Sequence, residues 1–199
     1  MADANAPTAS EHVAALLACK VWRTPELLSA NRVSAKAANT YGGNYGMGAL
    51  PLHTDLAHWH VPPRYLMLRC KVGDPSVETP LVHHREALRG LAPAVIQRAL
   101  FRPRRRLDGK MFFLRLIQGA IFRWDRLFLT ADNPEAQEVK AALSALDTRK
   151  HGTAIRLDEP GRTLVIDNWA MMHGRSAVPD SAVSRRIERA YFSEVVDGK

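Results

Sequence analysis

The chain has 199 residues, with 28 Lys and Arg against 20 Asp and Glu, which gives a formal net charge of +8. An apolar share of 46% excludes a disordered or collagen-like chain, and the length predicts a single domain over residues 1–199. No apolar run approaches the ~20 residues that a membrane span needs, so no membrane partner is expected. Only two cysteines are present, Cys19 and Cys70, which excludes a disulfide scaffold and indicates inert, buried thiols in a reducing compartment.

The N-terminal part of the chain is expected to be helical. Residues 1–10 are small and polar and are predicted to be disordered, whereas residues 11–40 are predicted to form a helical segment, with helices over 11–22 and 24–30 and Ser10 as N-cap. The apolar stretch over residues 13–18 is shorter than the ~7–15 residues of a secretory signal, which predicts a cytoplasmic protein. The glycine-rich residues 41–48 are expected to form a flexible turn or the rim of a pocket.

The remainder of the chain is dominated by strand-forming segments. Strands are predicted over residues 64–72, 110–116, 120–130, 153–157, 163–167 and 186–195. Helices are predicted over 85–100, broken at Pro93, and over 134–145, where Asn133 and Pro134 form a helix start. So many strands without regular strand–helix alternation predict a mainly β protein with flanking helices, of the β-sandwich or small jelly-roll barrel type.

Two histidines and an aspartate are candidates for a metal site. His53 and Asp55 are two residues apart, so on a strand both side chains point to the same face. His173, which follows the apolar strand 163–167, would complete a set of two histidines and one carboxylate, which suits Fe(II). A surface turn at 53–55 and a core role for His173 stay open, and the competing histidines are His58, His60, His83, His84 and His151.

The last predicted strand carries three arginines. In extended structure Arg185, Ile187 and Arg189 share one face, while Arg186 lies on the other. An arginine inside a barrel needs an anion, because an unpaired buried charge is costly, and a dicarboxylate would supply one. The alternative is a solvated strand edge.

Taken in order, the motifs of this chain resemble those of the taurine dioxygenase and γ-butyrobetaine hydroxylase family of Fe(II)- and 2-oxoglutarate-dependent oxygenases. The motifs that carry the resemblance are residues 50–55, 62–70, 78–79, 161–168, 173–175 and 185–191. The resemblance implies a double-stranded β-helix, a cupin-like jelly roll, with iron held by His53, Asp55 and His173. It also implies that 2-oxoglutarate is bound by Thr79 and by an arginine of the last strand. Alignment with the family motifs does not decide whether this arginine is Arg185 or Arg186. The face that Arg185 shares with Arg189 favours Arg185.

The implied activity is the hydroxylation or desaturation of an unactivated C–H of a small molecule, with O₂ as cosubstrate and release of succinate and CO₂. An amino acid or amino-acid-derived metabolite is the expected substrate, and no catalytic residue is expected beyond the metal ligands. The candidates for contacting the substrate are Arg189, Arg175, Trp59, Asn44 and Tyr45. A nucleic-acid demethylase of the same chemistry is an alternative favoured by the basic charge, but the last strand lacks the Arg-x-Asn-x-Thr-x-Arg pattern of those enzymes. A non-catalytic, metal-binding cupin-like protein is the other alternative.

Overall fold

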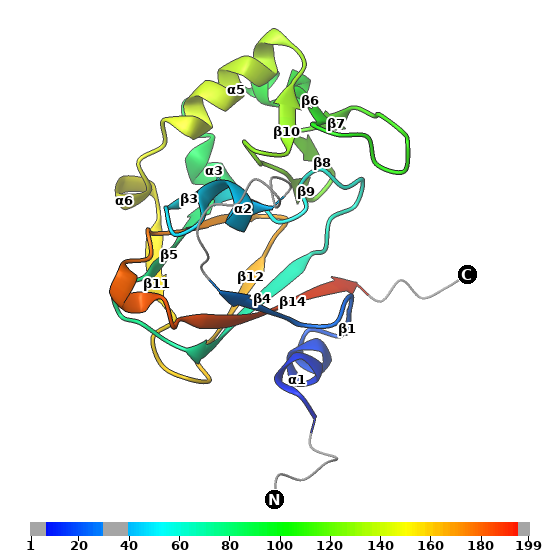
Figure 1. The fold of residues 1–199 in the computed structure, drawn as a ribbon. Helices are drawn as coiled ribbons and strands as arrows, with labels where there is room; N and C mark the ends of the chain where they lie inside the picture. The colour runs from blue at the N-terminus through cyan, green and yellow to red at the C-terminus, as the bar shows by residue number, and fades with distance from the viewer. Residues whose placement is uncertain (1–6, 30–39, 195–199) are drawn as a thin grey trace, which may run out of the picture.

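The computed structural model describes residues 7–29 and 40–194, and two antiparallel sheets form its centre (Figure 1). The larger sheet has the strand order β1-β14-β4-β12, and β2 also pairs with β14. Its strands are β1 (Cys19–Val21), β2 (Glu26–Ser29), β4 (Tyr65–Val72), β12 (Thr163–Asp167) and β14 (Arg186–Glu194).

The smaller sheet has the strand order β11-β5-β13-β3. Its strands are β3 (Leu50–His53), β5 (Glu78–His83), β11 (Thr153–Arg156) and β13 (Met171–Arg175). One apolar cluster joins the two sheets, because Leu66 and Ile187 of the larger sheet pack with Leu81 and Met171 of the smaller one. Two facing antiparallel sheets with helices outside them confirm the predicted jelly-roll architecture.

Side chains alternate between the two faces of each strand, as a pleated strand requires. In β4, Leu66 and Leu68 face the space between the sheets, whereas Met67 faces outward. In β13, Met171 faces inward and Met172 packs on the opposite side. The inner faces therefore line the barrel interior, and the outer faces are free to bind the surrounding helices.

Helices cover the outer faces of both sheets. α1 (Ala9–Leu16) packs through Ala14 against the outward side chains of the larger sheet, among them Phe192. The outer face of the smaller sheet packs through Val82 and Met172 on the largest apolar cluster. That region contains the helices α3 (His84–Ala87), α4 (Pro93–Arg98), α5 (Pro134–Ser144) and α6 (Thr148–His151) and the strands β6 (Leu100–Pro103), β7 (Leu114–Arg115) and β10 (Leu129–Ala131). Pro93 begins α4, which confirms the predicted break.

The predicted N-terminal helical segment is largely wrong. α1 ends at Leu16, and its N-cap is Thr8, whose hydroxyl and backbone N–H exchange hydrogen bonds with Glu11 in a capping box. The expected helix over residues 24–30 is instead β2, which pairs with β14. Residues 1–6 and 30–39 of the predicted disordered and helical regions lie outside the described residues.

Two other predictions change in extent. The glycine-rich stretch begins with a short helix, α2 (Tyr41–Tyr45), capped by Thr40. The long hairpin expected over 110–130 is reduced to β8 (Ile117–Gln118) and β9 (Ile121–Phe122), which pair with each other. Of the two cysteines, Cys70 is buried as predicted and Cys19 is half-buried. None of the helices in residues 7–29 and 40–194 combines the length and apolarity that crossing a bilayer requires.

Candidate metal centre and cavity

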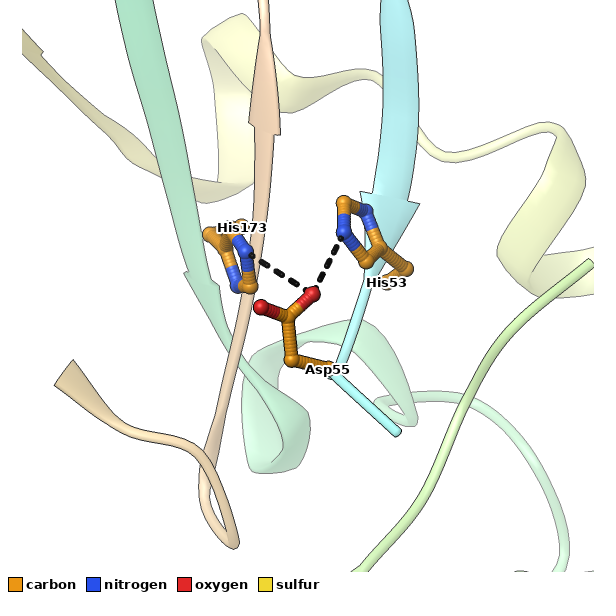
Figure 2. A group of neighbouring side chains, drawn as sticks. All are labelled: His53, Asp55 and His173. Carbon is orange, nitrogen blue, oxygen red and sulfur yellow. Dashed lines mark hydrogen bonds and ion pairs between the residues drawn. The ribbon is translucent and has the colours of Figure 1, made fainter. Parts of the chain in front are cut away.

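The two candidate histidines face each other on neighbouring strands. His53 ends β3, and His173 lies directly opposite it on β13, with ring centroids 4.4 Å apart. Asp55 follows two residues after His53 and turns into the same space (Figure 2). A β-carbon on Gly174 would lie 2.7 Å from the carbonyl oxygen of Leu50, so the glycine allows the two strands to approach closely here. Strand pairing therefore brings together residues that are over one hundred positions apart.

The donor atoms of these three side chains converge. Asp55 Oδ1 lies 3.1 Å from His53 Nε2 and 3.7 Å from His173 Nε2. His53 Nδ1 donates a hydrogen bond of 2.8 Å to the carbonyl oxygen of Pro51, which leaves Nε2 as the nitrogen that faces Asp55. All three residues are buried, and one ligand atom from each lies within 4.8 Å of the others.

The second oxygen of Asp55 is held by the last strand. Asp55 Oδ2 accepts a 2.6 Å hydrogen bond from the Tyr191 hydroxyl and lies 3.5 Å from the guanidinium of Arg189. Arg189 also pairs with Glu26 at 2.7 Å. Burial raises the pKa of Asp55, but the hydrogen bond from His53 and the positive charge of Arg189 outweigh burial and hold that pKa well below its usual range. Asp55 is therefore ionised and held in one orientation.

Burial and charge act differently on the two histidines. Burial lowers the pKa of His173 to about 3, and the positive charge on His53 contributes to this shift. For His53, the hydrogen bond to Asp55 and the charge of that carboxylate outweigh burial, so its pKa is raised. His173 is therefore a neutral imidazole, which is the form that binds a metal.

The cluster fits a divalent transition metal. Imidazole nitrogens and one carboxylate oxygen, with space left for further ligands, form the donor set typical of non-haem Fe(II) sites. The second oxygen of Asp55 and the second nitrogen of His53 are hydrogen-bonded to other groups, as is usual for metal ligands in proteins. The predicted set of His53, Asp55 and His173 is thus brought together in one place.

The Asn168 side chain fixes the backbone at Asp55 through hydrogen bonds. Its Oδ1 accepts a 2.7 Å hydrogen bond from the Asp55 N–H, and its Nδ2 donates to the carbonyl oxygens of Asp55 and Pro63 at 2.9 Å each. The side chain is fully buried. A buried amide with three partners fixes the turn from which Asp55 enters the barrel.

We expect Asn168→Ala to lower the free energy of unfolding by about 3 kcal/mol, because it leaves buried backbone groups without partners. Chemical denaturation would measure this change. Val165→Ala, at an exposed position of the same strand β12, is the control and should change the stability by less than about 1 kcal/mol. A loss of less than about 1 kcal/mol for Asn168→Ala would contradict the assigned role.

A cavity of about 680 Å³ opens on the metal-binding cluster. Its wall includes Thr79 of β5, which is buried, and Arg185, which is only 8% exposed. Ile187, Arg189 and Tyr191 line the same cavity, so the predicted shared face of residues 185, 187 and 189 is confirmed and continues to Tyr191. The inner face of one strand thereby contributes both cationic and polar groups.

Arg185 and Arg186 have different environments. Burial lowers the pKa of Arg185, and its buried Nε has no hydrogen-bond partner in the described part of the chain. Arg186 does not line the cavity, and its guanidinium donates to the carbonyl oxygens of Val183 and Arg185. A buried guanidinium with unused donors needs an anion, so Arg185 is the better candidate for binding a carboxylate.

The predicted substrate-contacting residues divide into two groups. Arg189 and Arg175 line the cavity, and Arg175 also donates to the carbonyl oxygens of Gly46 and Gly48, which fixes the turn after α2. The described wall does not include the other three. Trp59 packs edge-on against Trp22 at 5.4 Å, Tyr45 stacks on Tyr41 at 5.9 Å, and the Asn44 amide donates to the Thr40 carbonyl oxygen.

Several residues of the site were not found from the sequence. Tyr191 lies two residues beyond Arg189 on the same strand, so extending the period-two argument by one step would have found it. Asp125 and Phe128 line the cavity from a loop, where no period marks them. Tyr41, by contrast, begins the stretch 41–48 that the sequence predicts as a turn or the rim of a pocket, and it does line the cavity. The basic run of Arg104, Arg105 and Arg106 lines the exposed rim.

The architecture and the cluster together define a double-stranded β-helix with two histidines and one carboxylate inside it. The sequence matches no family profile and no curated protein. The fold, however, is similar to that of solved non-haem iron oxygenases. An asparagine oxygenase in complex with Fe(II), 2S,3S-3-hydroxyasparagine and succinate superimposes with a TM-score of 0.66, at 19% identity, over 85% of this chain and 56% of that one.

A second similar protein is the non-haem iron oxygenase OrfP. Its complex with Fe and alpha-ketoglutaric acid has a TM-score of 0.62, at 17% identity, over 86% of this chain and 57% of that one. Its complex with Fe, succinate and (3R,4R)-dihydroxy-L-Arg has a TM-score of 0.64, at 17% identity, over 85% of this chain and 58% of that one. The chain thus spans somewhat more than half the length of these structures, and the similarity confirms the fold.

Proposed function

We propose that this protein is an Fe(II)- and 2-oxoglutarate-dependent dioxygenase of the taurine dioxygenase and γ-butyrobetaine hydroxylase family. One observation carries the proposal: the cluster of His53, Asp55 and His173 opens on the same cavity as Thr79 and Arg185, whose buried Nε has no partner among the described residues. A metal-binding set and a buried cation in one cavity are what a 2-oxo acid with a distal carboxylate requires. The similarity of the fold to iron oxygenases supports the same conclusion.

Each residue has a defined part in this proposal. His53 and His173, through Nε2, and Asp55, through Oδ1, would hold the iron. Bound Fe(II) supplies the oxidising chemistry by which 2-oxoglutarate, O₂ and a substrate C–H become succinate, CO₂ and a C–OH group. Arg185 and Thr79 bind the distal carboxylate of 2-oxoglutarate.

The surrounding residues hold this arrangement in place. Tyr191 and Arg189 keep Oδ2 of Asp55 occupied, so that Oδ1 faces the histidines. The burial of all three ligand side chains limits their contact with water, which strengthens the charged interactions among them. The protein thus contributes binding, orientation and electrostatics.

We propose an amino acid or an amino-acid-derived metabolite as the substrate, which is hydroxylated or desaturated. The cavity volume of about 680 Å³ lies in the range of small-molecule sites, about 300–1,000 Å³. Both acidic and basic side chains line it, as a zwitterion would need. The asparagine oxygenase and OrfP complexes contain hydroxylated amino acids, which supports this class.

The test is anaerobic addition of Fe(II) and then 2-oxoglutarate to the purified protein. A visible absorption band that needs both components is the expected result. O₂ and a panel of L-amino acids are then added, and succinate formation is measured. A protein that binds neither Fe(II) nor 2-oxoglutarate would contradict the proposal. Iron binding without succinate from any substrate would instead favour the non-catalytic cupin-like alternative.

The nucleic-acid alternative has one observation in its favour, because Arg104, Arg105 and Arg106 are exposed at the cavity rim. An oligonucleotide bound there would show an affinity that falls steeply with salt concentration. Titration of single-stranded DNA and RNA at increasing salt distinguishes this alternative from a small-molecule substrate.

A further inference from the structure

One end of the cavity contains three buried polar atoms whose hydrogen bonding is incomplete. They are Nδ1 of His58, Oδ2 of Asp125 and the Tyr41 hydroxyl. Within the described residues none makes a hydrogen bond of normal geometry, although the Tyr41 hydroxyl lies close enough to the Asp125 carboxylate for the two groups to interact. All three side chains line the cavity that opens on the metal-binding cluster. Buried polar atoms in native proteins nearly always have hydrogen-bond partners. Atoms like these at a cavity wall therefore indicate a ligand that supplies the missing partners.

Asp125 is fixed rigidly in this position. Its Oδ1 accepts hydrogen bonds from the backbone N–H groups of Leu127 and Phe128, at 2.7 and 2.8 Å. The residue is 1% exposed, and only Oδ2 is left for another partner. Burial raises the pKa of this carboxyl, and the positive charge of His53 together with the hydrogen bonds offsets only part of that rise.

Aromatic rings line the same end of the cavity as the carboxylate. The Phe128 ring lies 5.6 Å from the ring of Tyr41 and 5.2 Å from that of His58. Tyr41 in turn stacks on His53, with centroids 4.0 Å apart, so this end of the cavity is directly beside a proposed iron ligand. A carboxylate in a cavity lined by aromatic rings is suited to an organic cation, because both the charge and the π-systems attract it.

The number of acceptors indicates which cation. Burial lowers the pKa of His58, so its imidazole is neutral and Nδ1 can accept a hydrogen bond. Asp125 Oδ2, Tyr41 Oη and His58 Nδ1 are then three acceptors, and a primary ammonium has three N–H donors. The chemistry of this end of the cavity matches a primary ammonium better than a neutral or anionic group.

We propose that Asp125, together with Tyr41 and His58, binds a primary ammonium group of the substrate and places that end of the molecule beside His53. The proposal rests on the proposed function, since it assigns a substrate subsite in the same cavity. Asp125 is the charged anchor, and the two rings complete the hydrogen bonds.

The test is calorimetric titration of the protein, loaded anaerobically with Fe(II) and 2-oxoglutarate, with L-amino acids, α,ω-diamines and their N-acetylated forms. Wild type should bind at least one primary amine and should bind its N-acetylated form more weakly. Asp125→Asn keeps an oxygen for the Leu127 and Phe128 N–H groups but removes the charge, so the Kd for that amine should rise by about 30-fold or more. Tyr41→Phe should raise it by about 3- to 10-fold.

Asp132→Asn is the matched control, because Asp132 pairs with Arg102 at the surface and does not line the cavity. It should change the Kd by less than about 2-fold. Retained amine affinity in Asp125→Asn, or a wild type that binds the acetylated forms as well as the free amines, would overturn the proposal.

The visible band separates this result from the proposed function. If Asp125→Asn forms the band as the wild type does and binds amines unchanged, the subsite is refuted and the dioxygenase assignment stands. If the band never forms in the wild type, the dioxygenase assignment fails, and the same titration of the metal-free protein decides the subsite.

Discussion

Replacing His173 with Ala is expected to lower the affinity of the protein for Fe(II) by more than about 100-fold. Loss of groups that only orient metal ligands costs about 10- to 100-fold, and His173 is itself a proposed ligand. The two donors that remain, His53 and Asp55, already contact each other at 3.1 Å and would be left as a hydrogen-bonded pair. Anaerobic calorimetry with Fe(II) measures the affinity directly.

His12→Ala is the control for this variant, because His12 is exposed on α1, on the outer face of the larger sheet. It should bind Fe(II) as the wild type does. Asp55→Ala should lose binding as completely as His173→Ala, and it also leaves the half-buried Arg189 with one carboxylate partner fewer. Unchanged Fe(II) affinity in either ligand variant, in a protein that melts as the wild type does, would show that the cluster is not the metal centre.

The second large effect is expected at Arg185. Arg185→Ala should raise the Kd for 2-oxoglutarate by at least about 30-fold, because truncating one partner of a buried charge pair costs about 2–5 kcal/mol. Fe(II) affinity should stay within about 3-fold of the wild type, since Arg185 does not contact the three proposed ligands. The measurement is a 2-oxoglutarate titration of the Fe(II)-loaded protein, followed through the visible band.

Arg186→Ala provides a matched control on the next residue. Its guanidinium is bound to backbone carbonyl groups outside the cavity, so the Kd for 2-oxoglutarate should change by less than about 3-fold. A larger effect for Arg186→Ala than for Arg185→Ala would mean that the face of β14 turned toward the cosubstrate is not the face that lines the cavity.

Side-chain periodicity explains what the sequence could predict. The alternation along residues 185–191 predicted one face for Arg185 and Arg189, and the spacing of His53 and Asp55 predicted one face for that pair. In the structure all four residues line the cavity. These are local rules, and they hold wherever a strand forms. The resemblance of the ordered motifs implied that His173 joins His53 and Asp55, which no local rule gives.

The failed predictions share a different cause. Residues 24–30 have a composition that a helix tolerates, yet β2 forms there because its backbone pairs with β14, more than 150 residues away. The aromatic residues Trp59 and Tyr45 are near the cavity but pack on other rings, since ring packing depends on neighbours that the sequence does not reveal. Asp125 reaches the cavity only in the folded chain, and no motif or periodic pattern marks it in the sequence.

Residues 123–125, which directly follow β9, contact both the segment 54–60 and the cavity. Arg123, fully buried, donates to the carbonyl oxygens of Ala57, Trp59 and His60, and burial lowers its pKa to about 10. The backbone of Trp124 is hydrogen-bonded to Thr54, the residue between the proposed ligands His53 and Asp55. Asp125 then turns into the cavity.

Residues 123–125 therefore link the proposed substrate subsite to the backbone that positions the metal-binding residues. An insertion or deletion at these positions would move the loop that carries His58, the turn at Thr54 and the Asp125 carboxylate together. Selectivity in this protein should therefore be re-engineered by exchanging single side chains such as Asp125 while the length of the stretch is preserved, and libraries that vary its length should yield inactive proteins.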